Sequence, residues 1–492
     1  MNFPYRYVAQ IVVEAKTPLA VGSDSLKYDL DKPVEKDFND LPFIPGTAIA
    51  GYLRKKVADN IDALFGDKPE EYKEQSTGSN IIVSDAFLMD NEGTVHQQPE
   101  IINDDFLNHY FKLPVRQHTA INEYGAAKEH GKFDTEVVYK GSRFKFEIEL
   151  QLSEKKDNDW KEILNTFFRN DFYLGSGEFN NFGELKVIEI KERCFDLNKN
   201  LDTYLNYDVD LNEIGEGFQD YKPENTEVTQ PYQENEIKLS GKNSFFHFGA
   251  GYGDTLVDNV NYTEFVVEGW GEIDKPKTNN VKFEEYYVIP GTSIKGTLAH
   301  RVAFHYNKEK GNTVEELIPK FKEKINKICN DEALNNLTLA EAEEELEKQK
   351  AELEKQLKKI QNTGTSIESI FENFLGEKND AVKSLFGESK NTKENKGQSG
   401  QIIFKDIYLK KKDFKEHIFY HNKIDRYTGG TIETALFSEK VLIIDETKIC
   451  YKYKEGIDLT VLNKAIDDLK NGMLPLGGLV NKGHGIFELK SE

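Results

Sequence analysis

One short stretch constrains the fold most, because the chain contains it twice. Residues 44–51 read IPGTAIAG, and residues 289–296 read IPGTSIKG. A Pro-Gly pair ends an extended segment, and a Thr directly behind it can cap a helix. Each copy therefore predicts a strand, a tight turn and a helix whose N-terminal amides attract anions such as phosphate. One such corner is common in ordinary folds, but two copies indicate a duplicated domain.

Other segments repeat in the same order on either side of these corners. The matching pairs are residues 19–23 with 246–251, 64–66 with 385–387, the strand around Asp85 with that around Asp406, the segments that begin at His118 and His421, and the glycine-rich segments 174–187 and 476–487. The order of predicted strands and helices in each copy suits a ferredoxin-like sheet with helices on one face, as in RNA-recognition domains. We therefore expect an α+β protein with tandem domains at residues 1–195 and 237–492, joined by an acidic linker at 196–236.

The second copy carries extra residues between its corner helix and its Leu-Phe-Gly segment, at about 307–382. Leu339, Leu346, Leu353 and Ile360 recur every seven residues among Glu and Lys, which is typical of a helical seam. Thr338 with Glu341 forms a capping box at its start. The pattern predicts an antiparallel helical hairpin with a solvated, charged outer face.

The charge of the chain argues against a freely exposed nucleic-acid binder. The net charge is −22, whereas such proteins usually carry a basic surplus. A local basic groove can nevertheless coexist with acidic outer faces. Three widely spaced cysteines, no membrane-length apolar run and no signal-like N-terminus lead us to expect a cytoplasmic protein with no membrane partner.

The order of these repeated motifs resembles the RAMP superfamily of CRISPR proteins. Within that superfamily, residues 424–429 (IDRYTG) and residues 31–34 (DKPV) resemble the repeating backbone subunits of type III effector complexes. The resemblance covers both halves but not the linker or the helical insertion. It implies two RAMP domains with β-hairpin thumbs that line up along a guide RNA and displace guide-target base pairs at intervals. It also implies other type III CRISPR subunits as partners, including a large polymerase-like subunit.

The resemblance further implies that an Asp in the loop before the corner cuts target RNA with a divalent metal, which we expect to be Mg²⁺. Asp31 matches this Asp in the first copy. In the second copy, Asp274 repeats the local Asp-Lys-Pro pattern, and Asp258 competes for the role. A carboxylate that holds Mg²⁺ beside the scissile phosphate neutralises developing charge while the neighbouring 2′-OH attacks. Without the resemblance, a solvated loop Asp is the simpler interpretation.

Basic, histidine and glycine residues supply the candidate RNA contacts. Single basic side chains are more often solvated, lone histidines are more often structural, and glycines often mark sharp turns. In the first copy, Ala50 stands where the second has Lys295, so we expect Arg54 to make that phosphate contact. The full set of expected RNA contacts is Arg54, Lys55, His118, Gly175, Ser176, Lys295, Arg301, His421, Arg426, Gly477 and Gly478.

Two other functions remain open from the sequence. One is a metal-independent, guide-processing endoribonuclease of the same superfamily that uses His chemistry; residues 44–60 contain no His for it. His484, in the second glycine-rich loop, suggests acid-base work. The other is a non-catalytic RNA-binding or capping subunit, which the acidity of the chain and the Ala at position 50 favour.

Overall fold

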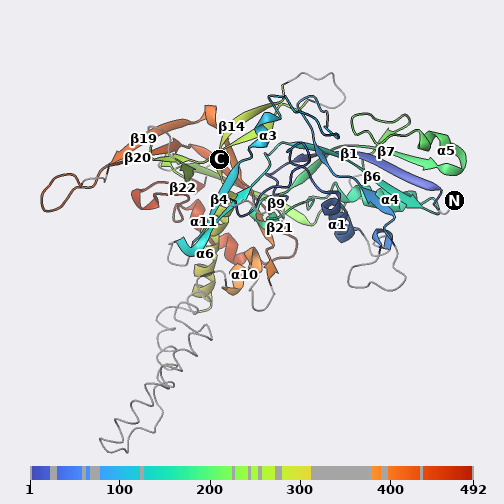
Figure 1. The fold of residues 1–492 in the computed structure, drawn as a ribbon. Coiled ribbons are helices and arrows are strands. Elements are labelled where there is room, and N and C mark those ends of the chain that lie inside the picture. The colour runs from blue at the N-terminus through green and yellow to red at the C-terminus, as the bar shows by residue number, and fades with distance from the viewer. Residues whose placement is uncertain are drawn as a thin grey trace, which may run out of the picture.

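The computed structural model describes two halves of mixed α+β structure with mostly antiparallel sheets (Figure 1). The described residues are 3–22, 30–57, 63–66, 78–121, 127–223, 228–241, 245–252, 257–271, 280–311, 376, 378–388, 397–432 and 436–489. Most of the expected helical insertion at about 307–382 therefore lies outside the described residues, as do Leu339 and the rest of its predicted seam. Among the helices that the structure describes, none combines the length and the apolar character needed to cross a bilayer.

The first half is built around the strand β1, which is buried along almost its whole length. The sheet runs, in spatial order, β2 (Ile81–Val83), β6 (Arg143–Leu152), β1 (Tyr5–Ala15), β7 (Leu185–Asp196) and β8 (Gln219–Asp220), with β3 (Phe87–Leu88) also on β6. One face of β1 packs against α1 (Gly46–Lys56) and α4 (Asp157–Thr166) through residues such as Leu53 and Trp160. A strand with this continuous apolar run needs cover on both faces.

The opposite face of β1 is covered by residues that follow β7. Leu197, at the start of α5 (Leu197–Leu205), packs against Val8, and Leu211 packs against Val12. The expected linker at 196–236 is thus more than a connection, because its first part covers the sheet and its last residues already belong to the next strand, which begins at Tyr232. The few apolar side chains of residues 196–236 are widely spaced among Asp and Asn, which is why the composition of this segment resembles that of a linker.

The second half repeats the strand order of the first. Its sheet runs β17 (Ile402–Phe404), β21 (Glu446–Lys454), β9 (Tyr232–Gly241) and β22 (Phe487–Leu489), which occupy the chain positions of β2, β6, β1 and β7. The helices α6 (Gly291–Glu309), α10 (Asp380–Phe386) and α11 (Thr460–Lys470) form its core with these strands through residues such as Leu298 and Leu462. The repeat found in the sequence therefore extends to the pairing of strands.

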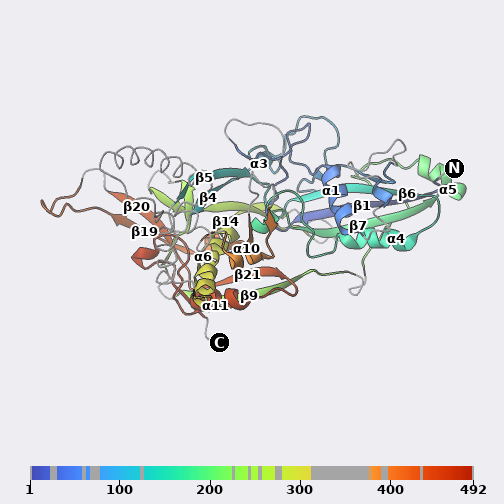
Figure 2. The same cartoon turned by 90° about the horizontal axis from the view of Figure 1, so that it is seen from below.

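Each half also extends a long hairpin away from its main sheet. The hairpins are β4 (Val115–Ile121) with β5 (Ala127–Glu136), and β19 (Lys415–His421) with β20 (Phe437–Ile443). Figure 2 shows the first hairpin lying beside the second half rather than over its own sheet, whereas the second hairpin projects away from both halves.

Shorter elements complete the chain. They are η1 (Ala63–Phe65), α3 (Asn108–Phe111), η3 (Glu178–Asn180), β10 (Phe245–Phe246), β11 (Gly249–Tyr252), β12 (Asn259–Asn261), β13 (Thr263–Glu268), β14 (Lys282–Ile289), β15 (Gly387–Glu388), β16 (Gln398–Ser399), β18 (Ile407–Lys410), η6 (Lys411–Asp413) and η7 (Val480–Lys482). The β13–β14 hairpin of the second half lies on the first half, where the Trp270 indole donates to the Gly141 carbonyl oxygen (2.8 Å). Between the halves, the buried Lys452 ammonium pairs with Glu184 (2.9 Å).

Candidate nucleic-acid interface

The two repeated corners have the same capping arrangement. The amide of Gly46 donates to Asp85 Oδ1 (2.8 Å), and the amide of Gly291 donates to Asp406 Oδ1 (2.7 Å). The helices begin at these glycines, and no side chain caps them from within the turn. The expectation that the Thr of the motif caps the helix was wrong, because a carboxylate from the connection between two neighbouring strands takes that role. The first amide of each helix is therefore not open to a phosphate.

Glycine is required at both corners because the helix lies against the strand backbone. A Cβ on Gly46 would lie 2.4 Å from the Val83 carbonyl oxygen, and one on Gly291 would lie 2.1 Å from that of Phe404. Real Cβ atoms do not approach an oxygen this closely. The Pro-Gly pair thus reflects helix-strand packing as well as the turn.

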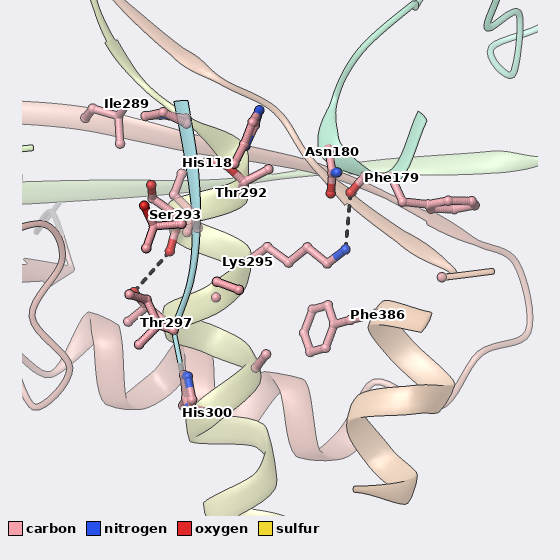
Figure 3. A pocket seen from close by; sticks show the side chains of 18 of the residues that line it. His118, Phe179, Asn180, Ile289, Thr292, Ser293, Lys295, Thr297, His300 and Phe386 are labelled. Atoms are coloured by element: carbon pink, nitrogen blue, oxygen red, sulfur yellow. Dashed lines mark hydrogen bonds between the residues drawn. The ribbon is translucent and has the colours of Figure 1, made fainter. Parts of the chain in front are cut away.

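A cleft of about 880 Å³ lies between the two halves. Its walls come from the β4–β5 hairpin, the start of α6, the glycine-rich loops of both halves and residues 398–400. Of the residues expected to bind RNA, the cleft brings together four: His118, Lys295, Gly477 and Gly478. Figure 3 shows Lys295 reaching from α6 toward the loop of the first half, where its Nζ donates to the Phe179 carbonyl oxygen (3.4 Å).

His118 is a neutral ring in this cleft. It stacks on Phe133 across the hairpin, with ring centroids 4.8 Å apart. Burial, together with the positive charges of Arg116 and Lys32, lowers the pKa of His118 to about 4, so the imidazole is uncharged at neutral pH. Its buried Nε2 has no hydrogen-bond partner among the described residues.

His421 holds the matching position in the second hairpin but has different neighbours. It stacks on Phe437 at the same centroid distance of 4.8 Å. Its Nε2 lies 2.8 Å from the carboxylate of Glu439, which is 1% exposed, and Lys482 lies 3.6 Å from the same carboxylate. At the strand position where the first hairpin has Thr135, the second hairpin therefore has a buried carboxylate, Glu439, which contacts His421.

The glycine-rich loops are explained largely by packing within each half. Gly175 has φ +82° and lies against the Ala20 carbonyl oxygen, to which the Ser176 amide donates (2.8 Å). Gly477 has φ +86° and lies against the His247 carbonyl oxygen, to which the Gly478 amide donates (2.6 Å). At both glycines, a residue with a side chain would be strained by the positive φ and would clash with the neighbouring carbonyl oxygen.

The remaining basic candidates fall into two groups. Arg54 donates to the Gly66 carbonyl oxygen (2.8 Å), and Arg301 pairs with Asp468 beside His305; both are held by their own half. Lys55 on α1 and Arg426 near the end of the second hairpin are exposed. The structure therefore does not gather all the expected RNA contacts into one place.

Asp31 lies exposed at the base of the first hairpin. Its Oδ2 accepts from the backbone amide of Asp134 (2.9 Å) in β5. Asp258 makes the equivalent contact in the second half, where its Oδ2 accepts from the backbone amide (2.7 Å) and hydroxyl (3.0 Å) of Ser438 in β20. These two hydrogen bonds, above all that from the amide, lower the pKa of the Asp258 carboxyl.

The strand register makes this equivalence independent of sequence alignment. The residue after each Asp pairs in parallel with the hairpin strand, as Lys32 with Thr135 and as Asn259 with Glu439. Among the described residues, Asp258 is therefore the geometric counterpart of Asp31. Asp274 lies outside the described residues, so its expected role stays a prediction.

The sequence analysis missed one buried charge, Arg116. Its guanidinium, on β4, donates to Glu264 (2.7 Å) and to Asp406 (2.7 Å), so it joins the first hairpin to the corner of the second half. The available signal was an Arg two residues before His118, together with the repeated Asp at position 406.

The described residues contain no group of three or more His, Cys, Asp or Glu side chains placed to hold a metal ion. A comparison with curated proteins finds no match. A family model of the RAMP superfamily matches residues 12–186 and 244–488. These two matches cover both halves, and they agree with the two capped corners and the two hairpins with matching histidines. The chain belongs to the RAMP superfamily.

Proposed function

We propose that this protein is a tandem backbone subunit of a type III CRISPR effector complex, with each half a ferredoxin-like RAMP domain. It binds guide RNA and cuts complementary target RNA at one site in each half. The observation that carries the proposal is the equivalence of Asp31 and Asp258, each of which accepts a hydrogen bond from a backbone amide at the same register position of a long hairpin.

The second hairpin suits the separation of stacked bases. Near its end, Tyr427 is 99% exposed, Ile424 is 59% exposed, and Arg426 is exposed beside them. The turn that presents them is firm, because Asp425 accepts from the Tyr427 and Thr428 amides (2.8 and 2.7 Å). Aromatic and guanidinium groups stack on unpaired bases. We infer that this hairpin is a thumb that displaces a nucleotide of the guide-target duplex.

Of the two hairpins, the first has the carboxylate oxygens that are better suited to hold a metal ion. Asp31 and Asp134 are neighbours there, and Asp134 Oδ1 is buried without a hydrogen-bond partner in the described part of the chain. Hard oxygen donors of this kind suit Mg²⁺, which takes one or two carboxylates and completes its shell with water and phosphate. Asp31 and Asp134 would hold the ion, which would stabilise charge that develops on the phosphate as the 2′-OH attacks.

The cleavage test uses the complex assembled on a guide, with end-labelled complementary RNA as substrate. Asn keeps the acceptor oxygen of Asp, so Asp31→Asn and Asp258→Asn each preserve the hydrogen bond to the hairpin while removing the charge. We expect each variant to lose one cut, at a different position, with guide and target binding unchanged. Asp274→Asn tests the other candidate of the second half: a full ladder from this variant supports Asp258, and a lost cut would move the second site to Asp274. A full ladder from Asp31→Asn would refute the site in the first half.

One observation favours a second function, the metal-independent endoribonuclease. His421 is held by the buried Glu439 with Lys482 beside it, which is an arrangement suited to proton transfer. Incubation of the protein with guide precursor in EDTA tests it, since loss of processing in His421→Gln would support this function over the metal-dependent one. If no variant changes any cut, the protein is a non-catalytic RNA-binding or capping subunit.

Guide RNA, target RNA and other type III subunits, including a large polymerase-like subunit, are the partners that this proposal requires. We place the complex in the cytoplasm, in keeping with the free thiols of Cys194 and Cys450.

A further inference from the structure

Each half places a lysine ammonium over the aromatic ring that stacks on its hairpin histidine. In the first half, Lys32 Nζ lies 5.1 Å from the centroid of the Phe133 ring. In the second half, Lys482 Nζ lies 5.0 Å from the centroid of the Phe437 ring. A cation over the face of an aromatic ring is attracted to the electrons of that face. The two halves therefore hold a positive charge at equivalent points of their hairpins.

The two lysines come from different places in the repeat. Lys32 follows Asp31, and strand pairing gives Asn259 as its counterpart. Lys482 is the last residue of η7 in the glycine-rich loop, and Asn180 is the last residue of the matching η3. Each of these short helices lies between two residues with left-handed backbone, which fixes the correspondence. Lysine and asparagine have therefore exchanged places between the halves, while the ammonium over the ring is kept.

The ammonium lies beside the Asp that the proposed function uses. Asp31 accepts from an amide of β5, and the residue before that amide carries the ring under Lys32. Asp258 accepts from an amide of β20, and the residue before that amide carries the ring under Lys482. In both hairpins, one strand residue supplies the ring and the next supplies the amide. A carboxylate and an ammonium are thus brought to the same point of each hairpin.

The lysine of the first half is not neutralised by an acid. Lys32 is exposed, and it forms no ion pair with a carboxylate of the described part of the chain, although Asp31 precedes it. Lys482 lies 3.6 Å from the buried Glu439 carboxylate, which offsets part of its charge. An exposed ion contact contributes little to stability. An ammonium kept at this point in both halves therefore points to an anion from outside the chain.

We propose that Lys32 and Lys482 each hold a non-bridging oxygen of the scissile phosphate, beside Asp31 and Asp258; this inference rests on the proposed RNA cleavage. Lysine binds phosphate as a point charge. In the cleavage step, the 2′-oxygen bonds to phosphorus and its proton passes to water, while the bond to the 5′-oxygen breaks and that oxygen takes up a proton from water. Negative charge grows on the non-bridging oxygens during this step, and a fixed ammonium stabilises it.

The exchange of lysine and asparagine supplies the test. Complex assembled on a guide cuts end-labelled target RNA in a single turnover, and the rate of each cut is measured separately. Lys32→Asn, which introduces the residue that the second half has at this position, should slow the first-half cut about 100-fold. Guide binding, target binding and the other cut should be unchanged. Lys482→Asn should slow the second-half cut by less, about tenfold, because Glu439 already offsets the lysine charge. Lys161→Asn changes an exposed lysine of α4 and is the matched control, with both cuts at the wild-type rate.

A double exchange separates the position of the ammonium from the residue that carries it. Lys32→Asn/Asn180→Lys gives the first half the arrangement of the second, and it should recover at least about tenfold of the lost rate. A cut that stays as slow as in Lys32→Asn would overturn the proposal. A wild-type rate in Lys32→Asn, together with loss of the same cut in Asp31→Asn, would overturn it and leave the proposed function standing. Absence of any cut that depends on Asp31 or Asp258 would refute both.

Discussion

Replacement of Arg116 by Met tests the buried charge cluster that joins the halves. The substitution keeps a long side chain but leaves Glu264 and Asp406 without their common cation. Removal of one partner from a buried ion pair costs about 3–5 kcal/mol, because the remaining charge is buried and uncompensated. For a folding unit of this size, each kcal/mol lowers Tm by about 2–4 °C. We therefore expect Arg116→Met to lower the Tm of the transition that includes the second half by roughly 10 °C at pH 8.

The loss should depend on pH in a definite direction. Burial raises the pKa of Asp406, and Arg116 opposes that rise, so the variant should raise the pKa further. An acid whose pKa is higher in the folded than in the unfolded protein favours folding at low pH, and this stability is lost as pH rises through the folded-state pKa. The difference in the free energy of unfolding between wild type and variant should thus be large at pH 8 and smaller at pH 5. For one carboxyl, it changes by up to about 1.4 kcal/mol per pH unit.

Differential scanning calorimetry at both pH values measures these differences. Lys55→Met is the matched control, since this exposed lysine on α1 loses a charge without leaving a buried one; it should change Tm by less than about 2 °C. Arg116→Met/Glu264→Gln should recover part of the loss because one buried charge is gone. A Tm within about 2 °C of wild type at pH 8, or a loss of equal size at pH 5, would contradict the reasoning.

Two further substitutions test the corner and the cleft. Gly291→Ala should destabilise the protein by about 2–3 kcal/mol, because its Cβ would meet the Phe404 carbonyl oxygen. Gly296→Ala lies on the same helix with open space around it, and it should stabilise the protein by about 0.5–1 kcal/mol. Thermal denaturation of both variants distinguishes a steric clash from a general effect of substitution in the motif. Lys295→Glu should weaken guide RNA retention and lower its salt dependence, measured by filter binding across salt concentrations, and unchanged retention would remove Lys295 from the RNA path.

The sequence predicted the repeated framework well, because its signals are local. The Pro-Gly corners and the repeated order of segments around them depend on neighbours in the chain, and the structure has a helix that begins at each corner. The packing of residues 197–211 over one face of β1 could not be predicted from such local signals. Leu197 and Leu211 stand among polar residues, and they are buried because they cover the apolar face of β1 that carries Val8 and Val12.

The candidate site was predicted less completely, for a related reason. Asp31 was found through a local motif, but its counterpart in the second half is set by strand register. Asp258 takes that position because Asn259 pairs with Glu439, a residue far along the chain. Arg116 was missed because its partners come from the opposite half: Glu264 lies in β13, and Asp406 lies between β17 and β18. Composition around one residue carries no information about such partners.

Differences between equivalent positions locate the specialisation of each half. The fold is stable with Thr135 or Glu439 at one hairpin position and with Arg116 or Phe419 at the position opposite, so neither residue of either pair is required for the RAMP framework. In the first half, the arginine fastens the hairpin to the second half. In the second half, the equivalent Phe419 packs on Phe245 of its own half, and the buried Glu439 contacts His421 at the end of β19. Within the described residues, the duplicated chain therefore uses its first hairpin to join its two halves, and its second hairpin has no equivalent arginine contact.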